Sequence, residues 1–258
     1  MNINTQKLWG SSQYYKMAEK GSEDINHPGM KLLLELAMSS KSVLDLGCGE
    51  GTRLHLVTTA DNKRVGLDIS KRAVETARKK YPGIRFIKRS LKEIPFKTNQ
   101  FDLVYSAYVL EHLIGVKKSL EEAIRVTKKH LVIICPNYGS PNRASPNFTG
   151  SRISKLLKGF LTDFTDHDIE EWNKVKPQKG LTETNYSMDD DTTVEPYIHT
   201  LLNFLIKKKL KIIYWDTCWD YELPGAFLHQ KIFRQFARIN IFPFKYWGPH
   251  IVVHAVKD

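Results

Sequence analysis

The sequence predicts a doubly wound α/β fold on a seven-stranded, mostly parallel sheet whose last strand is antiparallel. Short, nearly all-apolar segments alternate with amphipathic helical segments from about residue 30 to residue 136. Apolar strands separated by helices are typical of a parallel sheet covered on both faces, and right-handed crossovers then make the sheet doubly wound. After residue 136 the alternation breaks, and two more strands near the C-terminus are expected to close the sheet.

Each expected element follows from its local pattern. The expected helices are amphipathic segments at 30–39, 51–59, 70–80 and 193–209, with a further helical stretch after the fourth strand. Ser70 has the side chain of an N-cap. The expected strands are SVLDL (42–46), RVGLD (64–68), IRFIK (84–88), FDLVY (101–105), HLVIIC (130–135), KIIYWDT (211–217) and HIVVHAVK (250–257).

We interpret residues 1–258 as a single domain with four parts. A helical N-terminal cover (1–40) precedes the cofactor-binding half (41–136). A cap insertion on the substrate side (137–192) follows strand five, and the closing part (193–258) holds a helix, strands and a basic aromatic lid. Irregular segments often carry recognition, so substrate contacts are expected in the insertion and the lid.

The net charge of +11 raises the question of a nucleic-acid partner. Residues 1–150 contain 24 Lys and Arg against 14 Asp and Glu, whereas residues 151–258 contain 15 against 14. The excess lies largely on helical stretches such as KRAVETARKK (71–80), and solvated outer faces explain it better than a binding groove does. We therefore expect no nucleic-acid partner.

The cysteines and the hydropathy pattern indicate the compartment. Cys48, Cys135 and Cys218 are far apart and form no CxxC pair, so we expect reduced, buried thiols. No apolar run reaches the ~18 residues of a membrane span. The N-terminus also lacks the pattern of a signal peptide, and these features together predict a cytoplasmic protein.

The strongest functional signal is VLDLGCGEG (43–51), which places G-x-G-x-G between a strand and a helix. Glycines there let the backbone approach a ligand, and the helix N-terminus supplies free N–H groups. Dinucleotide sites use G-x-G-x-x-G, with the pyrophosphate at the helix N-terminus. In this sequence Thr52 occupies the position of the third glycine of that motif. Asp45, two residues before Gly47, would repel a pyrophosphate and favours a cationic ligand.

A second acid, Asp68, ends the next strand in VGLDIS (65–70). A carboxylate at this place can accept hydrogen bonds from both ribose hydroxyls of a nucleoside. A nucleoside that carries a cationic tail instead of phosphates describes S-adenosylmethionine. The glycine register and Asp45 therefore argue against a nicotinamide oxidoreductase.

These motifs resemble those of class I S-adenosylmethionine-dependent methyltransferases, particularly the group that includes ubiquinone-biosynthesis and related small-molecule enzymes, which have a Rossmann-like fold. Besides the glycine turn and VGLDIS, IKRSLKEIPF (87–96) resembles the segment flanking adenine and FDLVYSAYVLEHL (101–113) the fourth-strand motif. The resemblance covers residues 40–136 and implies S-adenosylmethionine as the cofactor. The cofactor contacts expected from it and from the turn are Asp45, Gly47, Cys48, Gly49, Gly51, Asp68, Ile69, Ser90, Leu91, Ser106, Ala107 and Tyr15.

Two of these implications carry alternatives. Tyr15 folds over the cofactor in this interpretation, or else anchors the first helix. In some ubiquinone-pathway relatives a Glu joins the Glu-His pair of the fourth-strand motif in binding a divalent metal. Tyr108 occupies the position of that Glu, so no metal is expected.

Methyl transfer to a hydroxyl needs an aligned acceptor and a base that removes its proton. The candidates for this catalytic role are His112 beyond the fourth strand, Tyr138 after the fifth and His199 on a helix near the same edge. Packing roles are the alternative for both histidines.

The predicted function is methyl transfer to a small molecule, by O-methylation of an apolar or lipid-like compound, because residues 223–247 are rich in aromatics and contain no acid. An RNA or protein methyltransferase with the same cofactor is the alternative. Within residues 226–242 apolar side chains form one helical stripe, which Phe233 widens. The stripe predicts peripheral membrane contact, or alternatively a helix that serves as a lid or packs in the core. The stripe consists of Leu228, Ile232, Phe236 and Ile239.

Overall fold

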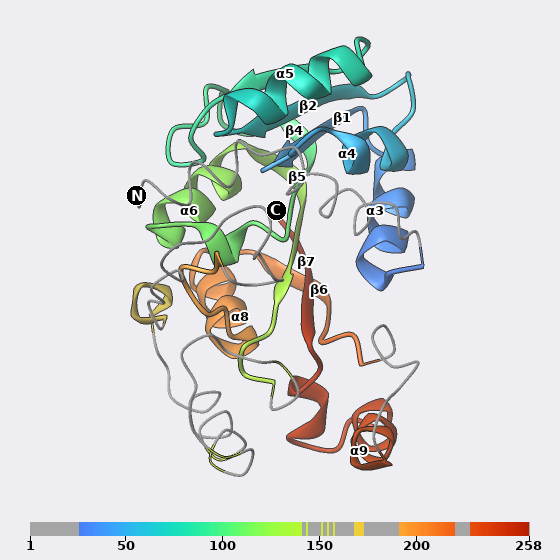
Figure 1. Cartoon of the computed structure of the whole chain (residues 1–258), viewed down its shortest axis with the longest axis vertical. Coiled ribbons are helices and arrows are strands. Elements are labelled where there is room, and N and C mark those ends of the chain that lie inside the picture. Colours follow the sequence, from blue (N-terminus) through green and yellow to red (C-terminus); the bar gives the residue numbers. More distant parts are fainter. Residues whose placement is uncertain are drawn as a thin grey trace.

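The sheet observed in the structure has the predicted architecture. The computed structural model describes residues 26–140, 143, 151, 154, 157, 168–172, 191–219 and 228–257. Its seven strands have the order β3-β2-β1-β4-β5-β7-β6. Strands β1 to β5 pair in parallel, whereas β7 is antiparallel to both β5 and β6. The doubly wound fold class is therefore confirmed (Figure 1).

The observed elements match the predicted ones to within a few residues at most ends. The strands are β1 (Ser42–Leu46), β2 (Lys63–Asp68), β3 (Arg85–Lys88), β4 (Phe101–Ala107), β5 (Thr127–Pro136), β6 (Lys211–Asp216) and β7 (His250–Val256). The helices are α3 (Pro28–Met38), α4 (Thr52–Val57), α5 (Lys71–Lys80), α6 (Val116–Val126), α8 (Ile198–Lys207) and α9 (Leu228–Arg238). Short 3-10 turns are η1 (Leu110–His112), η2 (Ile169–Glu171) and η3 (Phe244–Tyr246).

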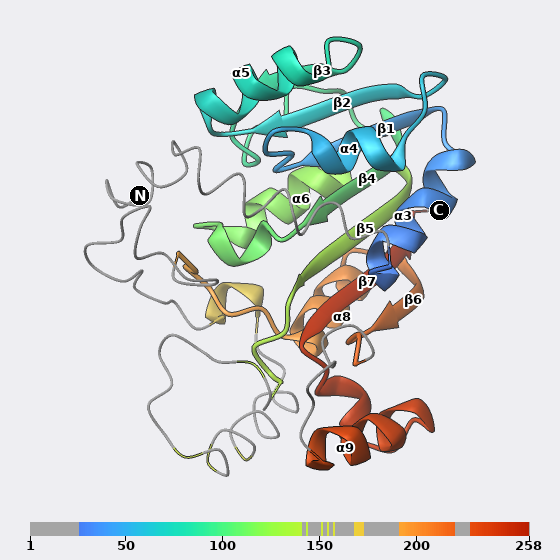
Figure 2. The ribbon, with the colours of Figure 1, turned by 45° about the vertical axis from the view of Figure 1, so that its right-hand side comes forward.

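Helices cover both faces of the sheet, as Figures 1 and 2 show. One apolar cluster joins α3, α4 and α5 to the sheet, with Leu33 and Leu54 fully buried in it. The other joins α6 and α8 to the opposite face, where Leu120 and Leu201 are buried. Alternate residues of β1 take part in the two clusters, so this central strand contributes to both. Burying each such side chain contributes about 1.5–3 kcal/mol.

The helix starts follow from capping chemistry. The Ser70 hydroxyl accepts a hydrogen bond from the backbone N–H of Ala73 at 3.2 Å, which confirms the predicted N-cap of α5. At α3 the cap is His27, whose Nδ1 accepts from the backbone N–H of Gly29 at 3.0 Å. An acceptor Nδ1 leaves the proton of neutral His27 on Nε2.

Helix α8 begins later than the sequence predicts. The periodicity suggested a start at residue 193, but the helix begins at Ile198. Pro196 disfavours a helical conformation in the residue before it. In addition, the backbone N–H groups of Thr193 and Val194 donate to the Glu111 carbonyl at 2.7 and 3.1 Å. This segment is therefore held on η1 beyond the end of β4.

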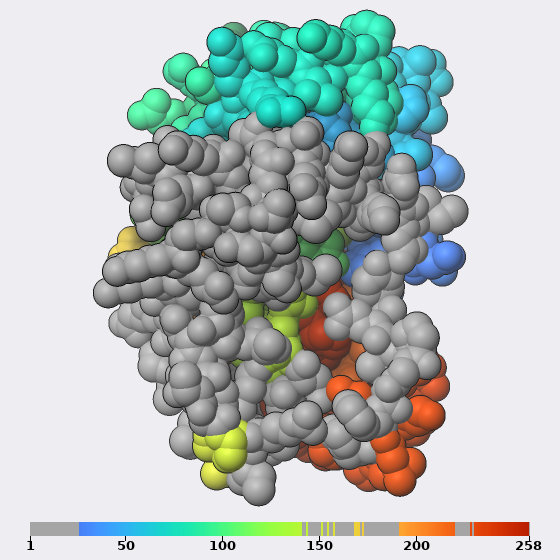
Figure 3. All heavy atoms as spheres, in the orientation of Figure 1, coloured from blue at the N-terminus to red at the C-terminus, as the bar shows by residue number. Residues whose placement is uncertain are grey.

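In Figure 3 the α5 and β3 region lies at one end of the molecule, and C-terminal residues lie toward the other. The three cysteines are buried and unpaired, as predicted. In the part of the chain that the structure describes, no helix is long and apolar enough to cross a membrane.

Gly248→Ala should destabilise the fold, because a Cβ at this position would collide with the Thr217 backbone carbonyl. Overpacking of this kind costs about 1–3 kcal/mol. Chemical denaturation monitored by circular dichroism should show a lower midpoint for this variant. Gly83→Ala is the control, since its Cβ would lie 3.4 Å from the Arg64 Nη2 atom, an ordinary contact. Equal midpoints for the two variants would contradict this account.

Candidate functional site

The glycine turn after β1 adopts a conformation that needs glycine. Gly47, Gly49 and Gly51 have φ angles of 81°, 53° and 85°, in the left-handed region. A Cβ at Gly47 would collide with the side chain of Val109, which follows β4. The turn therefore brings bare backbone against the end of β4, and α4 begins directly after it.

Hydrogen bonds tie this turn to the end of β2. The N–H groups of Gly47 and Cys48 donate to the Leu67 carbonyl at 2.7 and 2.9 Å. The Asp68 carboxylate accepts from the Gly49 N–H at 2.9 Å with one oxygen and from the Ser70 N–H at 2.8 Å with the other. Each carboxylate oxygen can accept a further bond. Asp68 thus holds the turn and keeps acceptor capacity for hydroxyl groups.

Burial shifts the pKa of Asp68. Loss of solvation raises the pKa of this carboxyl, while the hydrogen bonds from the Ser70 and Gly49 N–H groups oppose the shift. Hydrogen-bond donors that bind the ionised carboxylate of Asp68 would oppose the rise of its pKa further. Hydroxyl groups of a sugar are donors of this kind.

Asp45 is a buried carboxylate with an unsatisfied oxygen. Its residue is 1% exposed, and the Tyr105 hydroxyl donates to Oδ2 at 2.8 Å. Burial raises the pKa of Asp45 to about 7, although the nearby positive charge of Arg53 lowers it. Among the described residues, its Oδ1 atom has no hydrogen-bond partner, and neither does the buried Ser106 hydroxyl on β4. Unsatisfied buried polar atoms are costly, so both atoms favour a polar ligand.

Arg53, which the sequence analysis did not single out, lies beside these groups. Its Nη1 donates to the Ala107 carbonyl at 3.3 Å, and its guanidinium lies 5.8 Å from the centre of the Tyr108 ring. A cation near the glycine turn and the end of β4 is complementary to a ligand carboxylate. The helical position of Arg53, one residue inside α4, gave no local signal for this role.

Two other expected cofactor residues lie around the turn. The Cys48 side chain points inward, since a Cβ on Gly66 would lie 2.7 Å from its sulfur atom. Burial raises the pKa of the Cys48 thiol well above its usual range, so only its backbone is suited to ligand contact. Ile69, directly after Asp68, is 44% exposed and can cover a ligand held by that acid.

The segment after β3 lies next to Asp68. The Arg89 N–H donates to the Asp68 carbonyl at 2.9 Å, which places Ser90 and Leu91 just beyond this point. Leu91 is buried, and the Ser90 hydroxyl accepts from the Lys92 N–H at 3.3 Å. Of the expected cofactor contacts, Tyr15 lies outside the described residues.

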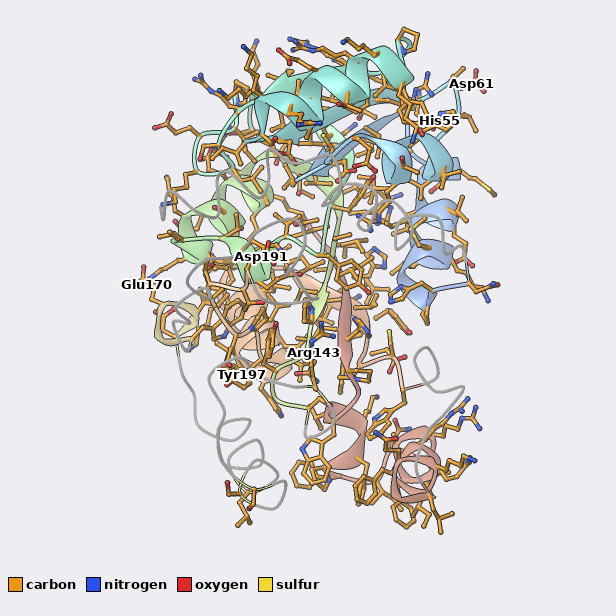
Figure 4. All side chains as sticks on the ribbon, viewed as in Figure 1. His55, Asp61, Arg143, Glu170, Asp191 and Tyr197 are labelled. Atoms are coloured by element: carbon orange, nitrogen blue, oxygen red, sulfur yellow. The ribbon has the colours of Figure 1, made fainter. Side chains whose placement is uncertain are left out.

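Two of the three candidate catalytic residues meet the same short segment. His112 Nδ1 lies 3.4 Å from the buried Asp191 carboxylate, and its Nε2 lies 3.7 Å from the carboxylate of Glu111. The Tyr138 hydroxyl is hydrogen-bonded to the Thr192 hydroxyl at 2.9 Å. The ends of β4 and β5 are therefore joined through consecutive residues 191 and 192. Figure 4 shows Asp191 in the middle of the molecule, far from His55 and Asp61.

His199 has different surroundings. Its ring stacks on Tyr246 with centroids 4.4 Å apart, and Tyr246 in turn lies 5.0 Å from the ring of Trp215 on β6. Burial lowers the pKa of His199. These contacts are those of a packed helix histidine, which was the alternative to a catalytic role.

A further polar cluster was missed by the sequence analysis. The Tyr108 hydroxyl is hydrogen-bonded to His27 Nε2 at 3.0 Å and to His250 Nδ1 at 3.1 Å. Tyr108 has a φ of 59°, which is uncommon for a residue with a side chain. In the sequence His27 lies 81 positions from Tyr108 and His250 lies 142 positions from it, so no local pattern could reveal the cluster. Among the described residues no group of three or more His, Cys, Asp or Glu is suited to hold a metal ion.

Comparison with known proteins identifies the family of the central segment. Residues 44–135 match the family described as methyltransferase domain. The chain is 30% identical over 112 residues to a probable S-adenosylmethionine-dependent methyltransferase of Mycobacterium tuberculosis, covering 42% of this chain and 41% of that protein. It is also 30% identical over 115 residues to a 2-phytyl-1,4-naphtoquinone methyltransferase of Nostoc, covering 41% and 50%. The chain thus spans about half or less of the length of these relatives.

Solved structures agree in fold. A Haloferax volcanii putative methyltransferase, solved with the Trm112 methyltransferase activator, has a TM-score of 0.56 at 16% identity over 97% of this chain and 96% of that chain. A Mesorhizobium loti S-adenosylmethionine-dependent methyltransferase has a TM-score of 0.51 at 18% identity over 97% and 100%. The glycine turn and the two acids lie within or beside the matched segment. Residues 44–135 therefore match the methyltransferase-domain family, and the fold of the chain agrees with that of S-adenosylmethionine-dependent methyltransferases.

Proposed function

We propose that the protein transfers a methyl group from S-adenosylmethionine to a hydroxyl oxygen of an apolar small molecule. The observation that carries the proposal is the glycine turn held against Asp68, next to the unsatisfied Asp45 oxygen. Relatives named as naphthoquinone and demethylmenaquinone methyltransferases support an apolar acceptor. The second of these, from Renibacterium salmoninarum, is 30% identical over 41% of this chain and 44% of its own length.

The described residues fit the cofactor at both ends. Asp68 accepts the ribose hydroxyls with the remaining capacity of its carboxylate. Asp45 Oδ1 accepts from the ammonium group of the amino-acid end, which satisfies the unpartnered oxygen. Arg53 binds the carboxylate of the same end. The two opposite charges of that end therefore each meet a complementary side chain.

Proton removal is assigned to His112. When bound, the cofactor supplies a methyl group on a sulfonium, so the protein has only to align the acceptor and remove its proton. Asp191 faces Nδ1 of His112 and orients the ring, and Nε2 is the atom that takes the acceptor proton. With the cofactor bound, His112 would take the proton of the acceptor hydroxyl while the oxygen gained the methyl group that the cofactor's sulfur gives up. The carboxylates of Asp191 and Glu111 stabilise the resulting imidazolium.

The cofactor contacts can be tested one end at a time. Asp68→Ala should weaken binding of both S-adenosylhomocysteine and 5′-methylthioadenosine about 10–100-fold, because a lost hydrogen bond to a charged group costs about 1.5–3 kcal/mol. Arg53→Gln should weaken only S-adenosylhomocysteine, since methylthioadenosine lacks the amino-acid end. Calorimetry measures all four affinities.

Asp61→Asn is the matched control for these variants, because this acid is exposed and lies at an outer edge of the molecule (Figure 4). Its affinities should equal those of the wild type. An Asp68→Ala protein that binds both ligands normally would remove the ribose assignment. An Arg53→Gln protein with equal losses for both ligands would remove the carboxylate assignment.

The catalytic assignment predicts a separation of turnover from binding. His112→Asn should lower kcat by about 100–10,000-fold, the usual contribution of a general base, and leave the affinity for S-adenosylhomocysteine unchanged. Asp191→Asn should lower kcat less and shift its pH profile. Product S-adenosylhomocysteine is measured against a panel of hydroxylated naphthoquinones and phenols.

His55→Asn is the control for this experiment, since His55 is exposed, stacks on Tyr81 and lies far from Asp191 (Figure 4). Full turnover by His112→Asn would contradict the role of this residue. Methylation of RNA or of a protein, with none of the small-molecule panel accepted, would overturn the proposed acceptor class.

The raised pKa of Asp45 predicts how stability depends on pH. Between pH 3.8 and about 7 the folded protein binds this proton and the unfolded chain releases it, so stability falls as pH rises through that range. The full effect is at most about 4 kcal/mol, at about 1.4 kcal/mol per pH unit. Asp45→Asn should remove this fall and raise the melting temperature of the cofactor-free protein at pH 8. A variant that melts with the same pH dependence as the wild type would contradict the account.

A further inference from the structure

Helix α9 carries an apolar stripe that faces away from the protein. Leu228, Ile232, Phe236 and Ile239 recur at helical spacing and are 74%, 43%, 36% and 67% exposed. The chain continues the stripe beyond the helix with Ile241 and Phe242, which are 40% and 47% exposed. We call these six residues the α9 stripe. Contiguous exposed apolar side chains of this kind mark a surface for interaction.

The other face of α9 fixes the stripe in this orientation. Phe233 packs against Phe244 and Trp247, with ring centroids 4.9 and 6.2 Å apart. The buried Ala237 joins the same cluster, together with Trp219. Phe233 therefore does not widen the stripe, as the sequence suggested, but packs toward the protein, and Phe236 at the edge of the stripe also contacts Phe244. A lid or core helix would bury Leu228 and Ile239, whereas here they are the most exposed members of the stripe.

The charges along this C-terminal segment all have one sign. Residues 223–257 contain no Asp or Glu. Lys231 and Arg238 are exposed on α9, and Lys245 lies over the Trp215 ring at 4.4 Å from its centre. An apolar stripe flanked by Lys and Arg is complementary to a surface that is apolar inside and anionic at its headgroups.

We propose that the α9 stripe docks the protein on the surface of an anionic lipid bilayer. The apolar side chains enter the boundary between headgroups and acyl chains, while Lys231 and Arg238 stay among the phosphates. Figure 2 shows α9 at the opposite end of the molecule from α5, so this contact leaves the β3 edge of the sheet away from the lipid. The docking does not depend on which acceptor is methylated.

Flotation of the full chain with lipid vesicles tests this inference. The wild type should float with vesicles of phosphatidylcholine containing about 30% phosphatidylglycerol, and much less with phosphatidylcholine alone. About 0.5 M NaCl should weaken the binding, because salt screens the cationic contribution. Ile232→Ser/Ile239→Ser should bind about tenfold more weakly, and Lys231→Glu/Arg238→Glu should lose the preference for anionic vesicles.

The control Met38→Ser/Ile206→Ser also removes two exposed apolar side chains, 81% and 56% exposed, but from α3 and α8. It should bind vesicles as the wild type does. Melting curves and S-adenosylhomocysteine affinity should be unchanged in all variants, which separates this test from that of the proposed reaction. No flotation of the wild type, equal loss in the control, or a wild-type dimer that the Ile232→Ser/Ile239→Ser variant converts to a monomer would overturn the proposal.

Discussion

The hydrogen bond from the Gly49 N–H to the Asp68 carboxylate is the contact on which the site depends. At 2.9 Å it joins the turn after β1 to the end of β2, two parallel strands that lie side by side in the sheet. The same carboxylate accepts from Ser70, the N-cap of α5, so one side chain connects two strand ends and a helix start. Ligands of doubly wound sheets bind beyond the carboxyl ends of the strands, where this contact lies. The acid that shapes the turn therefore also faces the ligand.

The burial of Asp45 has an energetic consequence for the protein without its cofactor. A buried carboxylate with one unsatisfied oxygen favours its protonated form, which is why its pKa is raised to about 7. A cationic ligand reverses this preference, because it stabilises the ionised form in a poorly solvated place. The free-energy cost of the buried, ionised Asp45 carboxylate is thus offset when the ligand binds. This effect favours a positively charged ligand over a pyrophosphate.

The central half of the fold could be predicted because its signals are local. Apolar strands, the glycine turn, the cap at Ser70 and the position of Asp68 are each defined by a few neighbouring residues. The partners of the candidate catalytic residues are not local: His112 meets Asp191 79 positions later, and Tyr108 meets His250 142 positions later. The late start of α8 has the same origin, since Thr193 and Val194 bind the Glu111 carbonyl rather than continuing the helical periodicity. A helical stripe likewise predicts which residues share a face, but not whether that face is buried, as α9 shows.

A crystal structure of the protein with S-adenosylhomocysteine is the most direct measurement of the central claim. The account predicts both ribose hydroxyls within hydrogen-bonding distance of the Asp68 carboxylate, with the Gly49 contact retained. It also predicts the ligand's amino group next to Asp45 and its carboxylate next to Arg53. A ligand bound elsewhere, or a ribose that leaves Asp68 without a new hydrogen bond, would contradict it.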